Sequence, residues 1–424
     1  MKVLIITYYW PPAGGSGVQR WLKFVKYLPQ YGISPVVYTV ENPKYAILDE
    51  TLQKEIADTV EILKQPIKEP NNLLLIFSKK NTKTSAGFLA TNPSFFGKVA
   101  HYIRANYFIP DARKFWVKPS VVFLTNYLSN HHIDAVITTG PPHSLHLIGL
   151  QLQQKLGVRW IADFRDPWTA IDYFHQLPLT KKSIQKHQQL ESEVVSKADG
   201  IVVVSNTMKE NYEKYNKNIE VITNGFDTEP QISEVQLDTK FTLVHVGLMN
   251  ADRNPKILWK VLAALIGENS DFARDFQLKL IGKVAAEVAT DIRKYHLMPH
   301  VKFIDYVPHN EVVEYQKKAQ VLLLAVNKVP NAKGIVTGKV FEYLQAQRPM
   351  LAIAPEDGDL AEIISTTNSG TVVDFDDAVQ LRNVIENYYE AYKNHNLAVR
   401  SKNCEQYHRK NLTKQLAMLL QKQH

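Results

Sequence analysis

The chain has 424 residues, of which 45% are hydrophobic and 22% charged, and it carries a net charge of +8 at pH 7. This length exceeds what one hydrophobic core usually covers, so we expect two domains of about 200 residues each. A single cysteine excludes a disulfide framework and is typical of a reducing cytosol. The net positive charge favours an acidic partner, such as a nucleotide or an anionic lipid surface. The lack of nucleic-acid-binding motifs disfavours DNA and RNA.

The first half of the sequence alternates buried strands with helices. Val3 to Thr7 is predicted to be a strand rather than a signal peptide, because no small-residue cleavage site follows it. A helical stripe from Val18 to Leu28 ends near Gly32, and Pro35 to Val40 is the next strand. Residues 42–118 are less regular. The remaining predicted elements are a helix near 119–131, a strand at 133–138, a helix at 144–156, a strand at 158–163, a helix at 181–197, and strands at 201–204 and 220–223.

Residues 227–240 interrupt this alternation and are predicted to be a linker. After it the alternation restarts. The predicted strands are 241–246, 276–281, 301–304, 321–326, 350–354 and 371–373, with helices between them and two closing helices. Strands that alternate with helices imply parallel sheets covered on both faces. We therefore predict an α/β protein of two doubly wound parallel-sheet domains, 1–226 and 241–395, followed by a C-terminal helix within 396–424.

Three glycines stand between the first strand and the first helix, in the stretch GGSG. Gly15 and Gly17 would let the backbone approach a phosphate or a sugar at the helix N-terminus. A dinucleotide-binding fingerprint is the alternative, and Glu41 stands near the end of the second strand. That fingerprint requires a third small residue where Arg20 stands, so a nicotinamide cofactor is disfavoured.

Two later junctions in the first half carry polar side chains at the carboxyl ends of strands. In TGPPH, His143 could be a base, a partner of an acceptor hydroxyl, or only a helix N-terminal residue. In DFRDPW, two carboxylates flank Arg165, and one of them is expected to be structural, paired to that arginine or capping a helix. Because Asp163 still lies within the strand pattern, Asp166 is the candidate that orients an acceptor or balances charge.

The second half offers cations at two such junctions. Arg253 and Lys256 follow a strand and a glycine turn, a pattern that suits a diphosphate, although Lys256 could simply be solvated. In TGKVFEYLQAQRP, Thr337 is the expected N-cap of a short helix that places Lys339 and Glu342 on one face. A cation and a carboxylate at a helix start suit a ligand with phosphates at one end and hydroxyls at the other. The alternative is an i,i+3 salt bridge on a solvated face.

Taken together, these stretches resemble the retaining glycosyltransferases of family 4, whose GT-B architecture has two Rossmann-like domains facing a cleft. The resemblance rests on GGSGVQR, TGPPHSLH, DFRDPW, TNGFD, HVG with DRNP, and TGKVFEYLQAQRPMLA. The DFRDPW and PPHS segments are similar to a subgroup that builds bacterial surface polysaccharides. Its members add sugars to lipid-linked or oligosaccharide acceptors.

The resemblance implies that the first domain serves the acceptor and the second binds a nucleotide-sugar donor. Arg253 and Lys339 would contact the diphosphate, Gly17 would approach it from the other domain, and Glu342 would hold the ribose hydroxyls. No metal and no other cofactor is expected, because the cations would take the place of Mg²⁺. The architecture also implies that the C-terminal helix packs back on the first domain.

The match is incomplete at two places. Glu342 corresponds to the second residue of the family's paired-Glu signature, but the first falls at Gly334. The family's catalytic-region histidine falls about where Thr139 and Gly140 stand, and His143 is only nearby. A sugar-nucleotide epimerase of the same architecture, or a binding protein without turnover, therefore stays open as an alternative.

The region 79–118 is basic and rich in aromatic residues, which predicts contact with an anionic membrane. The alternative is that its aromatic side chains are core and its lysines solvated. We expect a cytoplasmic protein that can lie at the inner face of the cell membrane, near a lipid-linked acceptor.

Overall fold

The computed structural model describes residues 1–424 apart from 46, 69–94, 228–234, 306, 308 and 423–424. The chain divides into two units, the first formed by Met1–Asn224 with Arg409–His424 and the second by Gly225–His408. The chain thus returns to the first unit at 409 rather than at 396. Residues before 409 are tied to the second unit, since the Lys402 amide donates to the Thr367 carbonyl at 2.9 Å and the Phe226 amide to the Tyr407 carbonyl at 3.1 Å.

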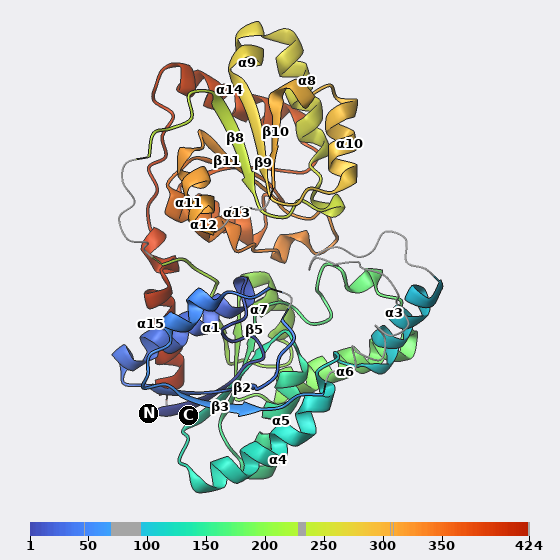
Figure 1. Cartoon of the computed structure of the whole chain (residues 1–424), viewed down its shortest axis with the longest axis vertical. Helices are drawn as coiled ribbons and strands as arrows, with labels where there is room; N and C mark the ends of the chain where they lie inside the picture. Colours follow the sequence, from blue (N-terminus) through green and yellow to red (C-terminus); the bar gives the residue numbers. More distant parts are fainter. Residues whose placement is uncertain (46, 69–94, 228–234, 306, 308, 423–424) are drawn as a thin grey trace. The chain divides into compact units, whose positions relative to one another are not determined.

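The first unit is a seven-stranded sheet of order β3-β2-β1-β4-β5-β6-β7 in which every pairing is parallel. Strands β2, β3 and β5 of this sheet are labelled in Figure 1. The order reverses between β1 and β4, and such a switch point is where ligands bind in doubly wound folds. Its elements are β1 (Lys2–Ile6), α1 (Ser16–Tyr27), β2 (Ser34–Val40), β3 (Glu61–Gln65), α3 (Phe95–Tyr107), α4 (Lys114–Asn130), β4 (Ala135–Gly140), α5 (Ser144–Leu156), β5 (Trp160–Phe164), α6 (Lys181–Lys197), β6 (Gly200–Val203), α7 (Asn206–Tyr212), β7 (Ile219–Val221) and α15 (Arg409–Gln421), with short 3-10 turns at 28–31, 50–55 and 174–176.

Strand β1 is buried on both faces, as a central parallel strand should be. Leu4 and Ile6 join the core formed with α4 and α5, whereas Val3 and Ile5 join the core formed with α1 and α15. The C-terminal helix α15 contributes the buried side chains of Leu412 and Leu416 to this second core.

The second unit is a six-stranded sheet of order β10-β9-β8-β11-β12-β13, also parallel throughout, with its switch point between β8 and β11. Two hydrogen bonds hold helix α12 (Lys339–Ala346) at this switch point. The Tyr343 hydroxyl accepts from the Val246 amide at 3.1 Å and donates to the Leu323 carbonyl at 3.3 Å. The elements are β8 (Phe241–Val246), η4 (Ala251–Arg253), α8 (Lys256–Glu268), α9 (Ser270–Asp275), β9 (Phe276–Ile281), α10 (Ala286–Lys294), β10 (Val301–Ile304), α11 (His309–Lys318), β11 (Val321–Ala325), η6 (Ala332–Gly334), α12 (Lys339–Ala346), β12 (Met350–Ile353), α13 (Asp359–Thr367), β13 (Gly370–Val373) and α14 (Ala378–Lys393), with 3-10 turns at 298–300 and 404–407.

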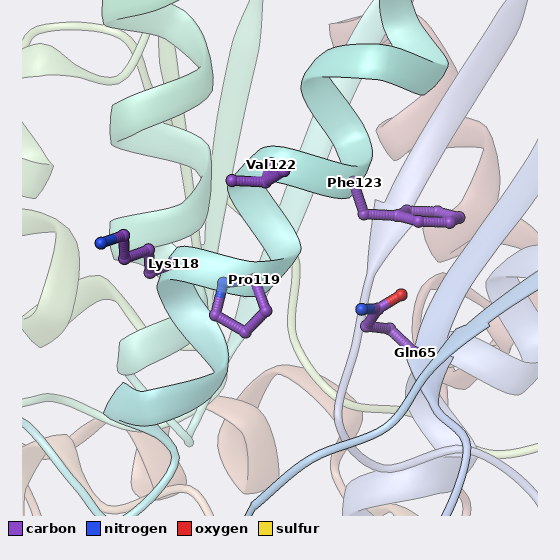
Figure 2. A pocket seen from close by; sticks show the side chains of 5 residues that line it. All are labelled: Gln65, Lys118, Pro119, Val122 and Phe123. Carbon is purple, nitrogen blue, oxygen red and sulfur yellow. The ribbon is translucent and has the colours of Figure 1, made fainter.

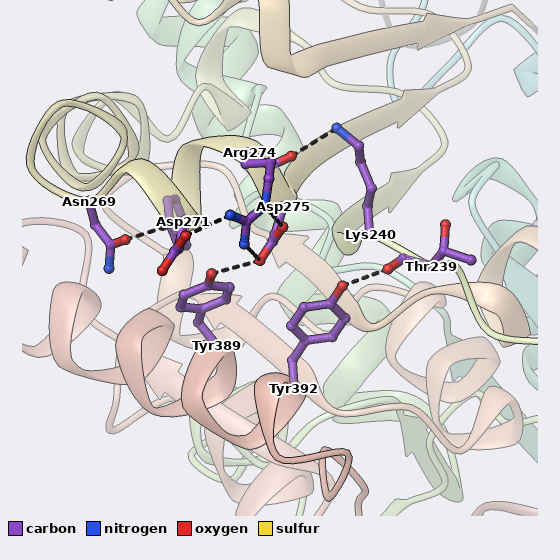
Figure 3. Close-up of polar contacts among 9 residues, drawn as sticks. Thr239, Lys240, Asn269, Asp271, Arg274, Asp275, Tyr389 and Tyr392 are labelled. Atoms are coloured by element: carbon purple, nitrogen blue, oxygen red, sulfur yellow. Dashed lines mark hydrogen bonds and ion pairs between the residues drawn. The ribbon is translucent and has the colours of Figure 1, made fainter.

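A polar network fixes the entry to this sheet (Figure 3). Arg274 binds Asp275 at 2.9 Å, and the Tyr389 hydroxyl of α14 donates to the same carboxylate at 2.9 Å. Just before β8, Lys240 donates to the Arg274 carbonyl at 3.0 Å and Tyr392 donates to the Thr239 carbonyl at 2.5 Å. These bonds anchor the end of the predicted linker to α9 and α14.

Three elements differ from the prediction. Strand β3 and helix α3 lie in the region described as irregular, and α4 begins at Lys114 rather than near 119. Pro119 lies inside α4, where a proline removes one helical hydrogen bond at a cost of about 3 kcal/mol. The helix tolerates it because Trp116 and Val121 on either side are buried in the first core.

Candidate active site

In the second unit, Lys339 at the start of α12 lies against Gly247 at the end of β8. Gly247 has φ 108°, a backbone conformation that favours glycine. A β-carbon at this position would stand 2.6 Å from Cε and 3.1 Å from Nζ of Lys339. The lysine side chain therefore occupies the space of the missing side chain at the switch point of the sheet.

Arg253 is a neighbouring cation. Its amide donates to Oδ1 of Asn250 at 2.9 Å, and its Nη1 donates to the Leu248 carbonyl at 2.9 Å, which folds the guanidinium back toward the end of β8. Burial and the charge of Arg253 lower the pKa of Lys339 to about 8, while Glu342 acts in the opposite direction. Two cations held near one another in this way are suited to an anion with more than one charge.

Glu342 lies one turn after Lys339 on α12. Its Oε2 accepts from Nε2 of the buried Gln316 at 3.2 Å. In the described part of the chain Glu342 acts on Lys339 through its charge, without a side-chain hydrogen bond, so the i,i+3 salt bridge that was the alternative is absent there. Lys256, in contrast, is exposed at the start of α8 and is not among the groups that shift the pKa of Lys339. The structure brings Arg253, Lys339 and Glu342 together and leaves Lys256 apart.

The loop before α12 differs from the prediction in detail. The helix begins at Lys339, and Thr337 Oγ1 accepts from its amide at 3.4 Å, with Gly338 rather than Thr337 in the cap position. Gly334, where the paired-Glu signature has its first residue, ends the turn η6. The adjacent Lys333 forms an ion pair with Asp357 at the surface.

In the first unit, the glycine loop opens onto the N-terminus of α1. Gly15 has φ 90°, and α1 has neither a side-chain cap nor an acidic residue in its first turn. Its first N–H groups are therefore suited to an anion. Gly17 is in contact with Arg165, because a β-carbon there would stand 3.0 Å from Nη1 of that arginine.

Asp163 is structural, as expected, but its ion-pair partner is Arg20 and not Arg165. Nη2 of Arg20 donates to Asp163 at 2.9 Å, and both side chains are almost fully buried. The second carboxylate oxygen accepts from Trp21 at 2.7 Å and from Thr139 at 2.8 Å. Of the two roles expected for the structural carboxylate, pairing to Arg165 or capping, the pairing is not found, because Arg165 donates to backbone carbonyls instead. The third small residue of the dinucleotide fingerprint is thus replaced by a buried arginine.

His143 lies between Trp168 and Gly140. Its ring stacks on that of Trp168 with centroids 4.8 Å apart and planes 7° apart. Its Nδ1 stands 3.0 Å from the place where a β-carbon on Gly140 would be. Burial, together with His146, Arg165 and His187, holds the pKa of His143 well below its usual range. The imidazole is therefore neutral at physiological pH and able to accept a hydrogen bond, while its lowered pKa makes it a weak base.

The loop that carries Asp166 is held by α6. Trp168 Nε1 donates to His187 Nδ1 at 3.0 Å, and the Glu191 carboxylate accepts from the Thr169 amide at 3.2 Å. Asp166 itself is exposed. Partial desolvation raises the pKa of its carboxyl to about 6, and the charge of Arg165 acts against this rise. Pro167 and Trp168 were expected to stiffen this turn, but the stacking of Trp168 on His143 and its bond to α6 were not predicted from the sequence. Only the position of Trp168 beside a strand end could have pointed to them.

A separate hollow of about 480 Å³ lies between α4 and the end of β3 (Figure 2). Its lining consists of Gln65, Lys118, Pro119, Val122 and Phe123. It contains none of the predicted site residues. Within the described ranges, no cluster of three or more His, Cys, Asp or Glu side chains is arranged to hold a metal. No helix in those ranges is long and apolar enough to cross a membrane.

Comparison with known proteins defines the class. Residues 85–230 match the model of Glycosyltransferase Family 4, and residues 240–391 match that of Glycosyl transferases group 1. With two Rossmann-like units, the chain is a glycosyltransferase of the GT-B class. It belongs to the family-4 type that the sequence motifs resemble, and the predicted fold and enzyme class are confirmed.

Solved structures of the same fold cover nearly the whole chain. WaaG, a glycosyltransferase involved in lipopolysaccharide biosynthesis, is 15% identical with a TM-score of 0.56, and the match covers 99% of this chain and 100% of WaaG. Staphylococcus aureus TarM, solved with UDP, fondaparinux and α-GlcNAc-glycerol, is 11% identical with a TM-score of 0.59, covering 99% and 100%. A putative UDP-N-acetylglucosamine 2-epimerase from Listeria monocytogenes is 10% identical with a TM-score of 0.55, covering 98% and 94%. A search of curated protein sequences gave no match.

Proposed function

We propose that the protein moves a sugar from a nucleoside diphosphate donor to a lipid-linked or oligosaccharide acceptor, with retention, in the synthesis of a bacterial surface polysaccharide. The observation that carries the donor assignment is the grouping of Lys339, Arg253 and Glu342 at the switch point of the second sheet. The complex of TarM with UDP supports a nucleotide ligand for the fold. The similarity of DFRDPW and PPHS to polysaccharide-building enzymes supports the acceptor class.

In this proposal the two cations stabilise the leaving group. Negative charge develops on the nucleoside diphosphate as the bond to the sugar breaks, and preorganised cations placed there lower the barrier. Lys339 and Arg253 would hold the diphosphate, and Glu342 would accept hydrogen bonds from the ribose hydroxyls. We propose that these residues make a metal cofactor unnecessary.

The first unit would serve the acceptor. We propose that the neutral His143 accepts a hydrogen bond from the acceptor hydroxyl and that Asp166 orients the acceptor from the neighbouring loop. Gly15 and Gly17 would let the donor phosphate approach the α1 N-terminus. Retention would follow from attack on the leaving-group side, with the departing phosphate taking the proton of the acceptor.

A donor screen tests this function against the alternatives. The protein is incubated with UDP- and GDP-sugars, with and without a membrane extract, and released nucleoside diphosphate is measured. Release that requires the extract supports transfer. Isomerised donor without release would identify an epimerase, the activity in the name of the putative epimerase of the same fold. Nucleotide binding with neither product would identify a binding protein, but the two family models are those of glycosyltransferases.

We further propose that α3 and α4 dock on an anionic lipid surface, at the inner face of the cell membrane. Val99, Tyr102, Ile103 and Tyr107 are exposed on α3 at spacings of a single helix face. Lys114 lies over the rings of Phe108 and Phe115 at 5.6 and 5.3 Å. Neither helix contains an acidic residue, so this face combines exposed apolar groups with cations only. Residues 79–94 of the predicted basic region lie outside the described residues.

Vesicle sedimentation tests the lipid contact. Binding to phosphatidylglycerol vesicles should exceed binding to phosphatidylcholine vesicles and should weaken with salt. Replacing Tyr102 and Ile103 by Ser should reduce it. Val379→Ser, at an exposed apolar position of α14 in the other unit, is the matched control and should bind as the wild type does. Equal binding to both lipids, or no loss in the α3 variant, would contradict the proposal.

A further inference from the structure

Arg165 connects the ends of three neighbouring strands in the first unit. Its Nη1 donates to the Gly17 carbonyl at 2.9 Å, in the first turn of α1 after β1, and its Nη2 donates to the Pro141 carbonyl, on the loop after β4. Its own amide, just after β5, donates to the Gly140 carbonyl at 2.9 Å. Because β1 and β4 flank the switch point, the guanidinium spans the place where this sheet is expected to meet its ligand.

The charge of Arg165 is not consumed by an ion pair. Asp163, on the strand before it, is engaged by Arg20, Trp21 and Thr139. Asp166, the next residue in sequence, is exposed and acts on Arg165 through its charge alone. Within the described residues no carboxylate lies within ion-pair distance of Arg165, although the Tyr9 ring lies 5.8 Å from its guanidinium carbon. The group is therefore a cation that makes its direct bonds to backbone carbonyls.

The two carbonyls belong to segments with different roles in the proposed site. Gly17 is the second residue of α1, and Pro141 is two residues before His143. A planar guanidinium can serve two acceptors at a fixed separation, whereas a lysine ammonium is a single point on a flexible stem. Contact with Nη1 also explains a glycine at 17, since a β-carbon would stand 3.0 Å from that atom.

We propose that Arg165 is a positioning residue for glycosyl transfer: by joining the first turn of α1 to the Pro141 loop, it fixes the distance between the α1 N-terminus and His143. It acts through these two segments and not on the sugar itself. This inference rests on the proposed function of the two segments. A misplacement of about 1 Å between reacting groups can cost about 100-fold in rate.

The test compares Arg165→Ala and Arg165→Lys with a matched arginine in the same unit. Arg159 also donates to two backbone carbonyls, those of Leu420 at 2.6 Å and Leu419 at 3.0 Å, at the end of α15. Arg159→Ala therefore removes the same kind of bonds away from the site. For every variant we would measure nucleotide affinity, donor KM, kcat, melting temperature, and kcat with added guanidinium at millimolar concentration.

For Arg165→Ala we expect kcat to fall about 100-fold, with nucleotide affinity and donor KM within about twofold of wild type. Guanidinium should restore part of this loss. In Arg165→Lys we expect kcat to fall about 10-fold. If the alanine variant does not fold, the lysine variant is the one compared with wild type. Arg159→Ala should lower the melting temperature and leave kcat unchanged.

Wild-type kcat in a folded Arg165 variant, or an equal loss of kcat in Arg159→Ala, would overturn the inference. Guanidinium that restores nothing would also contradict it. Failure of the proposed function itself would look different, because the wild type would then neither bind nucleotide nor release it from a sugar donor.

Discussion

Lys339 occupies the space that a side chain on Gly247 would need, with Nζ 3.1 Å from the position of the absent β-carbon. Arg165 has the same relationship to Gly17 in the first unit, where Nη1 is 3.0 Å from that position. In each unit a cation from one strand-to-helix junction thus lies against a glycine of another, beside the switch point of the sheet. This arrangement leads to specific expectations for variants.

Lys339→Ala should weaken nucleotide binding about 10- to 100-fold, because a hydrogen bond to a charged group contributes about 1.5–3 kcal/mol. Glu342→Ala should weaken it by a similar factor. Lys260→Ala, an exposed position on α8, is the control, and Lys256→Ala should have a smaller effect than Lys339→Ala. Calorimetric titration with UDP and GDP measures these affinities, and unchanged values in both site variants would remove the donor-site assignment.

Gly247→Ala should reduce both stability and nucleotide affinity. The new methyl group would meet Cε of Lys339 at 2.6 Å, and the positive φ adds strain of about 1–3 kcal/mol. Gly267→Ala near the end of α8 is the matched control, since a β-carbon there meets nothing within 4 Å. The control should be neutral or slightly stabilising. Denaturant unfolding and nucleotide titration of both variants test this prediction. Equal stability of the two would show that the Lys339 side chain moves away from residue 247 in solution.

Nucleotide affinity should fall as the pH rises through about 8. Burial and the charge of Arg253 lower the pKa of Lys339 to about 8, so the ammonium that would bind phosphate is present below this pH and lost above it. A bound anion stabilises the charged form and should move the transition to higher pH. Lys339→Arg should remove the dependence between pH 7 and 10, because arginine stays protonated there. Affinity in the wild type that stays level to pH 10 would contradict this role.

Asp163→Ala should destabilise the first unit by about 3–5 kcal/mol, because it leaves the buried Arg20 without its ion-pair partner. Asp376→Ala, which removes the exposed pair with Lys328, should cost no more than about 1 kcal/mol. Urea unfolding followed by intrinsic fluorescence compares the two. A similar small loss in both would mean that the Arg20–Asp163 pair is not the anchor of α1.

The sequence predicted the features that depend on local pattern. Runs such as Phe241 to Val246 are apolar enough to indicate buried strands, and the three-residue spacing of Lys339 and Glu342 places both on one helix face. The partner of Asp163 could not be found in this way. Arg20 is 143 residues away, and it reaches the carboxylate only because the sheet order brings α1 over the end of β5. Tertiary packing makes Arg20, and not the nearer Arg165, the ion-pair partner of Asp163. The spacing of residues along the sequence does not contain this information.

The start of α4 shows a second limit. Lys114 to Lys118 belong to the helix although Pro119 interrupts its hydrogen bonding, since burial of Trp116 outweighs a local preference. The separation of Lys256 from Lys339 is a third case. Both cations follow strands at the carboxyl-end edge of the second sheet. Only the side chain of Lys339 lies against Gly247, whereas Lys256 is exposed.

The most direct test of the central claim is transfer itself, measured with a sugar-labelled nucleotide donor identified by the screen and a lipid-linked or oligosaccharide acceptor. We predict that label appears in the acceptor in equal amount to the nucleoside diphosphate released, with retained anomeric configuration, and that Lys339→Ala reduces both together. Isomerised donor in the absence of acceptor, or no turnover by a folded wild type that binds nucleotide, would contradict the account.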